Sequence, residues 1–410
     1  MARMQGKTTP DVSQLFAGIV SKAHLDLQLS CERRSRRFTN DPADFYSSTY
    51  YTDRIIEYID DGLRSGKPFF AYLAFTAPHN PLHAPDAYIA KNRGRYDKGW
   101  DVLARERLQR QIKLGLVDGE IAAAERPNWV LAWHELTIEQ QAHRARDMEI
   151  YAGMINYVDH SIGRLLAHLR AVDAYDNTLI VFLSDNGPSK TAITDYLALG
   201  GDAEKFARGF DNSLENKGRP GSSTDIGPGW AFASATPLRL FKGYVAQGGV
   251  QVPAIIKLPE RRNAQTTTIS TPIHIKDLAP TFLQVAGIEY PSSYRGRQLA
   301  NIQGLSLLSL LESSEDSGFN ERGLGWEAYG MDAWRQGKWK ILRLPPPYGS
   351  GDWQLYDLLR DPGETVDLAA NNLGLVGQMA SGWEIYAEEN EVVHPDKPVF
   401  YSKPVSPGKY

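Results

Sequence analysis

The feature that most constrains the fold is a long amphipathic stretch enclosed by two short apolar runs. In MEIYAGMINYVDHSIGRLLAHLR, Met148–Arg170, apolar side chains recur at helical spacing and form one stripe. The run FFAYLAF, Phe69–Phe75, precedes this stretch and LIVFL, Leu179–Leu183, follows it, and both are typical of strands buried on both faces. This strand–helix–strand order predicts an α/β fold with a parallel sheet and right-handed crossovers.

The remaining segments predict a second, smaller unit. Val250–Pro259 is expected to add a strand, and Ile275–Gly287 a helix that ends at its glycine. We interpret the polar, helix-prone segment Arg93–Arg146 as an elaboration laid over the core. After about Asn320, short aromatic runs separated by turns predict a small antiparallel sheet. The expected organisation is an atypical segment 1–40, an α/β domain 41–320 and a small C-terminal antiparallel-sheet domain 321–410.

Composition excludes several classes of function. The 410 residues carry a formal net charge of −4, which gives no reason to expect nucleic acid or an anionic membrane surface as partner. No apolar run approaches the roughly 18–20 residues of a membrane-spanning helix, and the amino terminus lacks the apolar core of a signal peptide. The single cysteine, Cys31, excludes an internal disulfide. If Met1 is the true start, these features predict a cytoplasmic protein.

Two oxygen-bearing side chains follow the run Leu179–Leu183 almost directly. In open parallel sheets, ligands bind beyond the carboxyl ends of the strands. Asp185 and Asn186 lie at such a position and offer a carboxylate and an amide oxygen, which suit a hard cation such as Ca²⁺ or Mg²⁺. The Asp-Asn-Gly tripeptide is also typical of a turn with Asn or Gly in a left-handed conformation.

A histidine and a lysine occupy comparable places in two other loops. His79 follows the first apolar run in TAPHNPLHAP, and Lys242 precedes a glycine pair in FKGYVAQGGVQVP. A metal and a lysine can hold an oxyanion ester while a histidine assists the departing group. Taken singly, His79 would be a loop histidine and Lys242 a solvated surface lysine, and His83 is interpreted as structural. Only the order and spacing of the three loops favour a functional site.

Several long segments resemble the sulfatases of the alkaline phosphatase superfamily, above all microbial arylsulfatases. They include PFFAYLAFTAPHNPLHAP, DNTLIVFLSDNG, TPLRLFKGYVAQGGVQVPAIIKLP, RQGKWKI and WQLYDLLRDPGETVDL, which occur in family order between about Asp44 and Leu368. The resemblance implies an alkaline phosphatase-like fold, in which helices sandwich a mostly parallel central sheet beside a smaller C-terminal antiparallel domain. It also implies calcium-dependent hydrolysis of a small-molecule sulfate ester.

The resemblance assigns roles to four residues of this sequence. Asp185 and Asn186 match the family's Asp-Asn pair, which implies that they ligate calcium, with Mg²⁺ the less expected ion. His79 matches the histidine that contacts the sulfate ester, and Lys242 matches the lysine that binds the sulfate. The four residues would therefore form one site.

One part of the family pattern is absent from this sequence. Such sulfatases make a formylglycine nucleophile from a Cys/Ser-x-Pro/Ala-x-Arg motif, and they also use an early Asp-Asp pair and a Lys-x-His segment, none of which occurs here. Cys31, in CERRSRR, lacks the proline and is not expected to be the nucleophile. The hypothesis is therefore an arylsulfatase chain truncated or frame-shifted near Arg37, inactive as it stands, with weak metal binding.

Two other functions fit the same residues. One is a phosphonate or phosphate ester hydrolase of the same superfamily, which would use the same pocket. The other is a non-catalytic pseudosulfatase that binds anions or a protein partner.

Overall fold

The computed structural model describes residues 45–191, 208–260, 268–313, 316 and 318–394, together with the backbone of residues 28–31 and 34–37. Most of the predicted segment 1–40 and the side chain of Cys31 therefore lie outside the described residues. Within the described part, no helix is both long and apolar enough to cross a bilayer.

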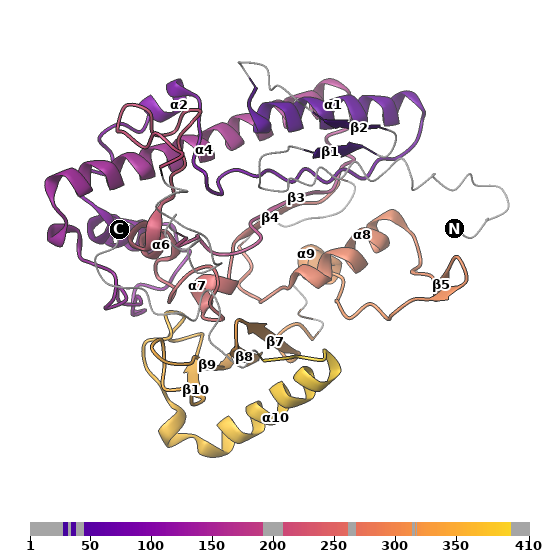
Figure 1. The fold of residues 1–410 in the computed structure, drawn as a ribbon. Coiled ribbons are helices and arrows are strands. Elements are labelled where there is room, and N and C mark those ends of the chain that lie inside the picture. Colours follow the sequence, from indigo (N-terminus) through magenta and orange to yellow (C-terminus); the bar gives the residue numbers. More distant parts are fainter. Residues whose placement is uncertain are drawn as a thin grey trace.

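The secondary structure alternates long helices with short strands (Figure 1). The helices are α1 (Ser47–Arg64), α2 (Asp86–Ala90), α3 (Trp100–Lys113), α4 (Ile138–Ala171), α6 (Gly227–Ala235), α7 (Gln247–Val250), α8 (Leu278–Ala286), α9 (Leu308–Ser313) and α10 (Leu373–Glu389). The strands are β1 (Gln28–Cys31), β2 (Arg34–Arg37), β3 (Ile180–Leu183), β4 (Ala254–Lys257), β5 (Ser293–Tyr294), β6 (Arg297–Gln298), β7 (Gly323–Ala328), β8 (Met331–Gln336), β9 (Trp339–Arg343) and β10 (Gln354–Asp357). Short 3₁₀ turns lie at Trp133–Glu135, Ile275–Asp277 and Ala369–Asn371.

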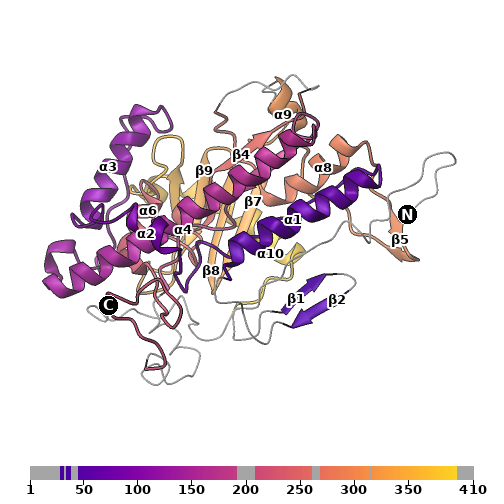
Figure 2. The same cartoon turned by 90° about the horizontal axis from the view of Figure 1, so that it is seen from above.

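Two long helices, α1 and α4, lie side by side and cover β3 and β4 (Figures 1 and 2). The predicted helix Met148–Arg170 is confirmed, and α4 begins earlier than its apolar stripe suggested. Its start is fixed by a capping box, in which the Thr137 side chain accepts from the backbone N–H of Gln140 while the Gln140 side chain accepts from the N–H of Thr137. The capping signal and the apolar stripe thus define different parts of one helix.

The predicted strand Phe69–Phe75 is wrong as a strand. No sheet partner is assigned to this run among the described residues. Phe69 and Leu73 pack against the apolar cluster between α1 and α4, whereas the ring of Tyr72 is 65% exposed. The apolar residues of this run pack against helices on one face. A strand also needs a neighbouring strand with which to form backbone hydrogen bonds, and apolar content does not indicate whether one is present.

The expected parallel pairing is also corrected within the described residues, because β3 and β4 are antiparallel. The predicted strand Val250–Pro259 is confirmed as the shorter β4, and its register places Leu183 opposite Ala254 and Ile180 opposite Lys257. Antiparallel pairing puts the end of β3 beside the start of β4. The loop after β3 and the segment before β4 therefore meet at one edge.

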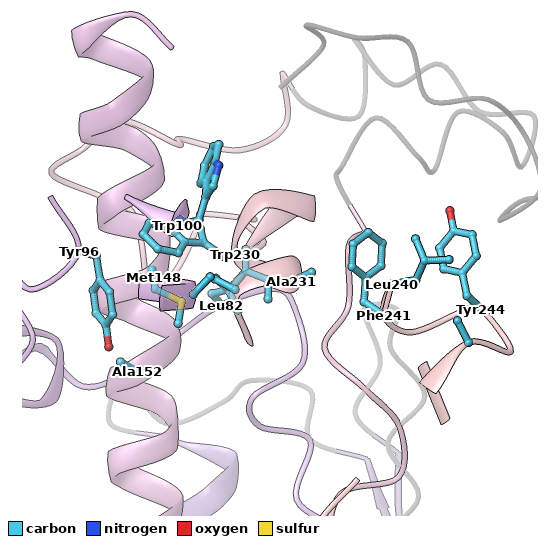
Figure 3. Close-up of a cluster of buried hydrophobic side chains, with 14 of the residues drawn as sticks. Leu82, Tyr96, Trp100, Met148, Ala152, Trp230, Ala231, Leu240, Phe241 and Tyr244 are labelled. Atoms are coloured by element: carbon cyan, nitrogen blue, oxygen red, sulfur yellow. The ribbon is translucent and has the colours of Figure 1, made fainter. Parts of the chain in front are cut away.

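The largest apolar cluster contains the indole rings of Trp100, Trp133 and Trp230, and Figure 3 labels the first and last of these. Trp100 lies 4.8 Å from Trp133 and 5.6 Å from Trp230 between ring centroids, and Trp230 is fully buried. Trp100 and Trp133 belong to Arg93–Arg146, so this segment is part of the core and not an elaboration over it. The prediction was wrong because a few large aromatic side chains can anchor a segment in the core even where most of its residues are polar.

The predicted small antiparallel sheet is confirmed. Its strand order is β10-β9-β8-β7, every neighbouring pair is antiparallel, and α10 packs on it. The predicted helix Ile275–Gly287 is also confirmed: a 3₁₀ turn leads into α8, and Gly287 ends it at φ +65°. Glycine is the residue that most readily adopts this left-handed conformation, because it has no Cβ atom.

Candidate active site

The structure brings His79 and Lys242 together. The Nζ atom of Lys242 lies 3.3 Å from Nε2 of His79, although 163 positions separate the two residues. Nδ1 of His79 lies 2.8 Å from the carbonyl oxygen of Asn80. Because a carbonyl oxygen only accepts, Nδ1 carries the proton and Nε2 is free to accept from the lysine ammonium. The Lys242 ammonium therefore donates to Nε2 of His79 in an exposed part of the structure.

The Asp-Asn-Gly loop is held against the Lys242 loop by backbone hydrogen bonds. The N–H of Gly187 donates to the carbonyl of Gly249 at 3.1 Å, and the N–H of Lys242 donates to the carbonyl of Pro188 at 3.0 Å. The Gly187 contact lies just beyond the end of the β3–β4 pairing, and the Lys242 contact lies farther along the chain from β4. The antiparallel register that sequence reasoning missed is thus what brings the two predicted loops together.

Gly187 is required by space and not by a left-handed backbone. Neither Asn186 nor Gly187 has a positive φ, so the alternative interpretation of a left-handed turn is wrong. A Cβ atom on Gly187 would lie 1.8 Å from the carbonyl oxygen of Gly248. The side chain of the third loop residue is absent because a second backbone occupies its place.

Asp185 and Asn186 supply the right type of ligand for a hard cation, but too few of them. Asp185 is exposed, and the Nδ2 of Asn186 donates to the carbonyl of Gly187, which orients the amide. No group of three or more His, Cys, Asp or Glu side chains that could hold a metal occurs in the described part of the chain. Calcium takes six to eight oxygens. The two residues therefore fit only one part of a calcium shell.

His83 has the structural role expected of it. Its Nε2 contacts the carbonyl oxygen of Ser222 at 2.9 Å, and the Tyr46 hydroxyl donates to the backbone carbonyl of His83. The N–H of Leu82 donates to the carbonyl of Thr224, which extends the connection. These bonds fix the loop that carries His79 to the segment before α6.

His79, Asp185 and Asn186 line a large open cleft of about 4450 Å³, whereas Lys242 is not among its lining residues. Small-molecule sites usually occupy about 300–1,000 Å³. The excess is apolar and is lined by the run 69–75 and by β3 and β4, whereas His79, Asp185 and Asn186 line a polar part of the same cleft. A small anion would use only that polar part.

Sequence reasoning missed a buried group behind the Lys242 loop. Lys340 and Glu364 form a fully buried ion pair, and both also bond to residues 245–247. The segments RQGKWKI and WQLYDLLRDPGETVDL contain these two residues, but a sequence motif alone did not reveal which loop they contact.

Comparison with known proteins finds sulfatases among both the sequence relatives and the solved structures. A family model described as Sulfatase matches residues 21–288. The chain is 35% identical over 362 residues to an uncharacterized sulfatase of Schizosaccharomyces pombe, across 86% of this chain and 65% of that relative. It is 36% identical over 272 residues to an arylsulfatase of Klebsiella aerogenes, across 66% of this chain and 57% of that relative. The chain thus spans less than two thirds of the length of either relative.

Solved structures confirm the predicted fold class, an alkaline phosphatase-like α/β fold with a smaller antiparallel sheet. Ps i-CgsB is similar with a TM-score of 0.54 and 22% identity, over 89% of this chain and 60% of that chain. A protein solved in complex with its substrate D-glucosamine-2-N,6-O-disulfate is similar with a TM-score of 0.52 and 17% identity, over 87% of this chain and 72% of that chain. At such identities the likeness concerns the fold alone.

Proposed function

Because the chain belongs to the sulfatase family, we propose that it carries the sulfate-ester site of an arylsulfatase-type, calcium-dependent sulfuric ester hydrolase. The observation that carries this proposal is the contact between Lys242 Nζ and His79 Nε2, beside a loop that offers Asp185 and Asn186. A fixed positive charge and a proton-handling imidazole in one place suit a sulfate monoester, whose transition state gains charge on the departing oxygen.

We infer separate tasks for His79 and Lys242. The Lys242 ammonium would neutralise a sulfate oxygen. In a protein that also supplies the family's nucleophile, the sulfuryl group would pass to that nucleophile as the S–O bond to the alcohol breaks, and the electron pair of this bond would stay on the departing oxygen. Once the ammonium binds the sulfate, Nε2 of His79 no longer accepts from it. With Nε2 protonated as well as Nδ1, the ring would give its Nε2 proton to the departing oxygen. The hydrogen bond from Nδ1 to Asn80 holds the ring in the orientation that this transfer needs. A bound calcium ion would neutralise further sulfate charge, and Asp185 and Asn186 would supply two of its ligands.

The proposal is tested by titrating the full chain with 4-nitrophenyl sulfate and with an aryl phosphonate, in calcium and in chelator. We expect saturable binding of the sulfate ester that is tighter in calcium and tighter than binding of the phosphonate. The formylglycine motif is absent from the 410 residues, so we expect binding without release of 4-nitrophenolate. A folded chain that prefers the phosphonate, or binds neither ester, contradicts the proposal.

Asp185→Ala is expected to weaken calcium binding, because it removes the only charged ligand that this loop offers. Isothermal titration with Ca²⁺ measures the change. Asp118→Ala is the matched control, because Asp118 is an exposed aspartate that does not line the cleft and whose carboxylate accepts from the backbone N–H of Glu120. Unchanged calcium affinity in Asp185→Ala would remove this residue from the metal site.

A further inference from the structure

A buried ion pair joins the C-terminal sheet to the loop that carries Lys242. Lys340 lies on β9, and Glu364 follows the turn Asp361-Pro362-Gly363. Their side chains are 0% exposed, and Nζ lies 2.7 Å from the Glu364 carboxylate. No solvent therefore screens or replaces this contact.

Every hydrogen-bonding position of the Lys340 ammonium is used, and two of its three acceptors belong to the loop. Nζ donates to the carbonyl of Val245 at 2.7 Å, to Oε1 of Gln247 at 2.9 Å and to Oε1 of Glu364. The second carboxylate oxygen of Glu364 accepts from the backbone N–H of Gln247 at 3.0 Å. Lys340 and Glu364 thus bind residues 245–247 together, Lys340 as a donor and Glu364 as an acceptor.

The turn that Lys340 and Glu364 hold, residues 245–249, lies directly beside the candidate site. Gln247 begins α7, and the carbonyl of Gly249, on the same helix, accepts from the N–H of Gly187. The N–H of Gly248 donates to the carbonyl of Arg239, which closes the loop that contains Lys242. The position of the turn therefore sets how the Lys242 loop meets the Asp-Asn-Gly loop.

Stability alone does not account for such a pair. Removing two charges from water costs about as much as their attraction returns, and apolar side chains of similar volume often stabilise a protein equally well. What an apolar pair cannot do is accept from the N–H of Gln247 and donate to the carbonyl of Val245. The feature specific to Lys340 and Glu364 is therefore the fixed placement of the turn.

We propose that Lys340 and Glu364 are positioning residues, which hold the turn 245–249 against the Asp-Asn-Gly loop and so set where the Lys242 ammonium meets the substrate anion. The last step rests on the proposed function of Lys242. The placement of the two loops does not, and it is measured separately.

The test replaces the pair with Lys340→Met and Glu364→Leu together, which leaves no unpaired buried charge. Amide hydrogen exchange in the full chain reports on the hydrogen bonds of Gly187 and Lys242. We expect exchange at these two amides to accelerate at least about tenfold, while exchange within β7 and β8 is unchanged. Lys338→Met is the control, because Lys338 pairs with Asp357 in the same region and donates no hydrogen bond to the Lys242 loop.

Affinity for 4-nitrophenyl sulfate is the second readout, and it is expected to fall in the paired variant but not in Lys338→Met. If the unaltered chain binds no sulfate ester, the proposed function fails, and amide exchange still decides the positioning role. Unchanged exchange at Gly187 and Lys242 in the folded double variant overturns the proposal. If the double variant does not fold, Gln247→Ala decides: it removes one contact to Lys340 and should accelerate the same two amides, and normal exchange there overturns the proposal.

Discussion

Single backbone positions determine whether the two central loops can meet. Gly187 lies against Gly248 and donates its N–H to Gly249, so the Asp-Asn-Gly loop depends on having no side chain at its third residue. The atoms that a Cβ would meet are backbone atoms, which cannot turn away as a flexible side chain can. A methyl group added at Gly187 should therefore shift the Asp-Asn-Gly loop relative to the loop that carries Lys242.

Gly187→Ala is expected to lower the free energy of unfolding by about 1–3 kcal/mol, because the added methyl overpacks a rigid contact. Gly163→Ala is the matched control: it lies on α4 with no atom within 4 Å of the added Cβ, and it should stabilise by about 0.5–1 kcal/mol. Urea unfolding measures both. Equal stability of Gly187→Ala and the unaltered chain would show that the loops are not closely joined there.

Among the elements, the connection between α8 and the C-terminal sheet depends on one buried carboxylate. Asp277 is fully buried, and the guanidinium of Arg322, just before β7, bonds to both of its oxygens. The backbone N–H groups of His274 and Leu305 donate to the same carboxylate. Burial alone would raise the pKa of Asp277, but Arg322 and these donors together hold it below its ordinary value.

Asp277→Asn should destabilise the protein by about 3–5 kcal/mol at pH 7, because it leaves the Arg322 charge buried without its partner. A lowered carboxyl pKa stabilises the folded state above the ordinary value near about 4, and this contribution is lost as the pH falls through the lowered value. The gap in the free energy of unfolding between the unaltered chain and Asp277→Asn should therefore narrow below about pH 4.

Urea unfolding at pH 7 and at pH 3 measures this gap. Asp86→Asn is the control, because Asp86 pairs with Arg219 on the surface with its side chain 64% exposed, and it should leave the unfolding midpoint nearly unchanged. A gap for Asp277→Asn that stays constant over this range would contradict the assigned ion pair.

Helices were better predicted than strands, for a physical reason. The stripe in α4 and the glycine at the end of α8 are local signals, because a helix makes its hydrogen bonds within itself. Phe69–Phe75 and β3 are both runs of apolar residues, yet only β3 is in a sheet. Pairing depends on a partner elsewhere in the chain, which the run itself does not specify.

Across the whole molecule, the sequence predicted residues for the candidate site but not the contacts that hold them. Order and spacing of three loops pointed to His79 and Lys242, which the structure places in contact. The support behind them comes from Lys340 and Glu364 in the C-terminal sheet, a link between distant segments that carries no local signal. The fold class was predictable because its motifs are long and ordered, whereas strand direction required the register of β3 on β4.

The central claim is that the Lys242 loop and the His79 loop together bind a sulfate ester. Calorimetric titration of 4-nitrophenyl sulfate into the unaltered chain, Lys242→Ala and the control Lys113→Ala tests it directly, since Lys113 is an exposed lysine at the end of α3. We predict that Lys242→Ala weakens binding by about 10- to 100-fold, the worth of a hydrogen bond to a charged group, while Lys113→Ala binds normally. Equal affinity in all three folded proteins would contradict the account.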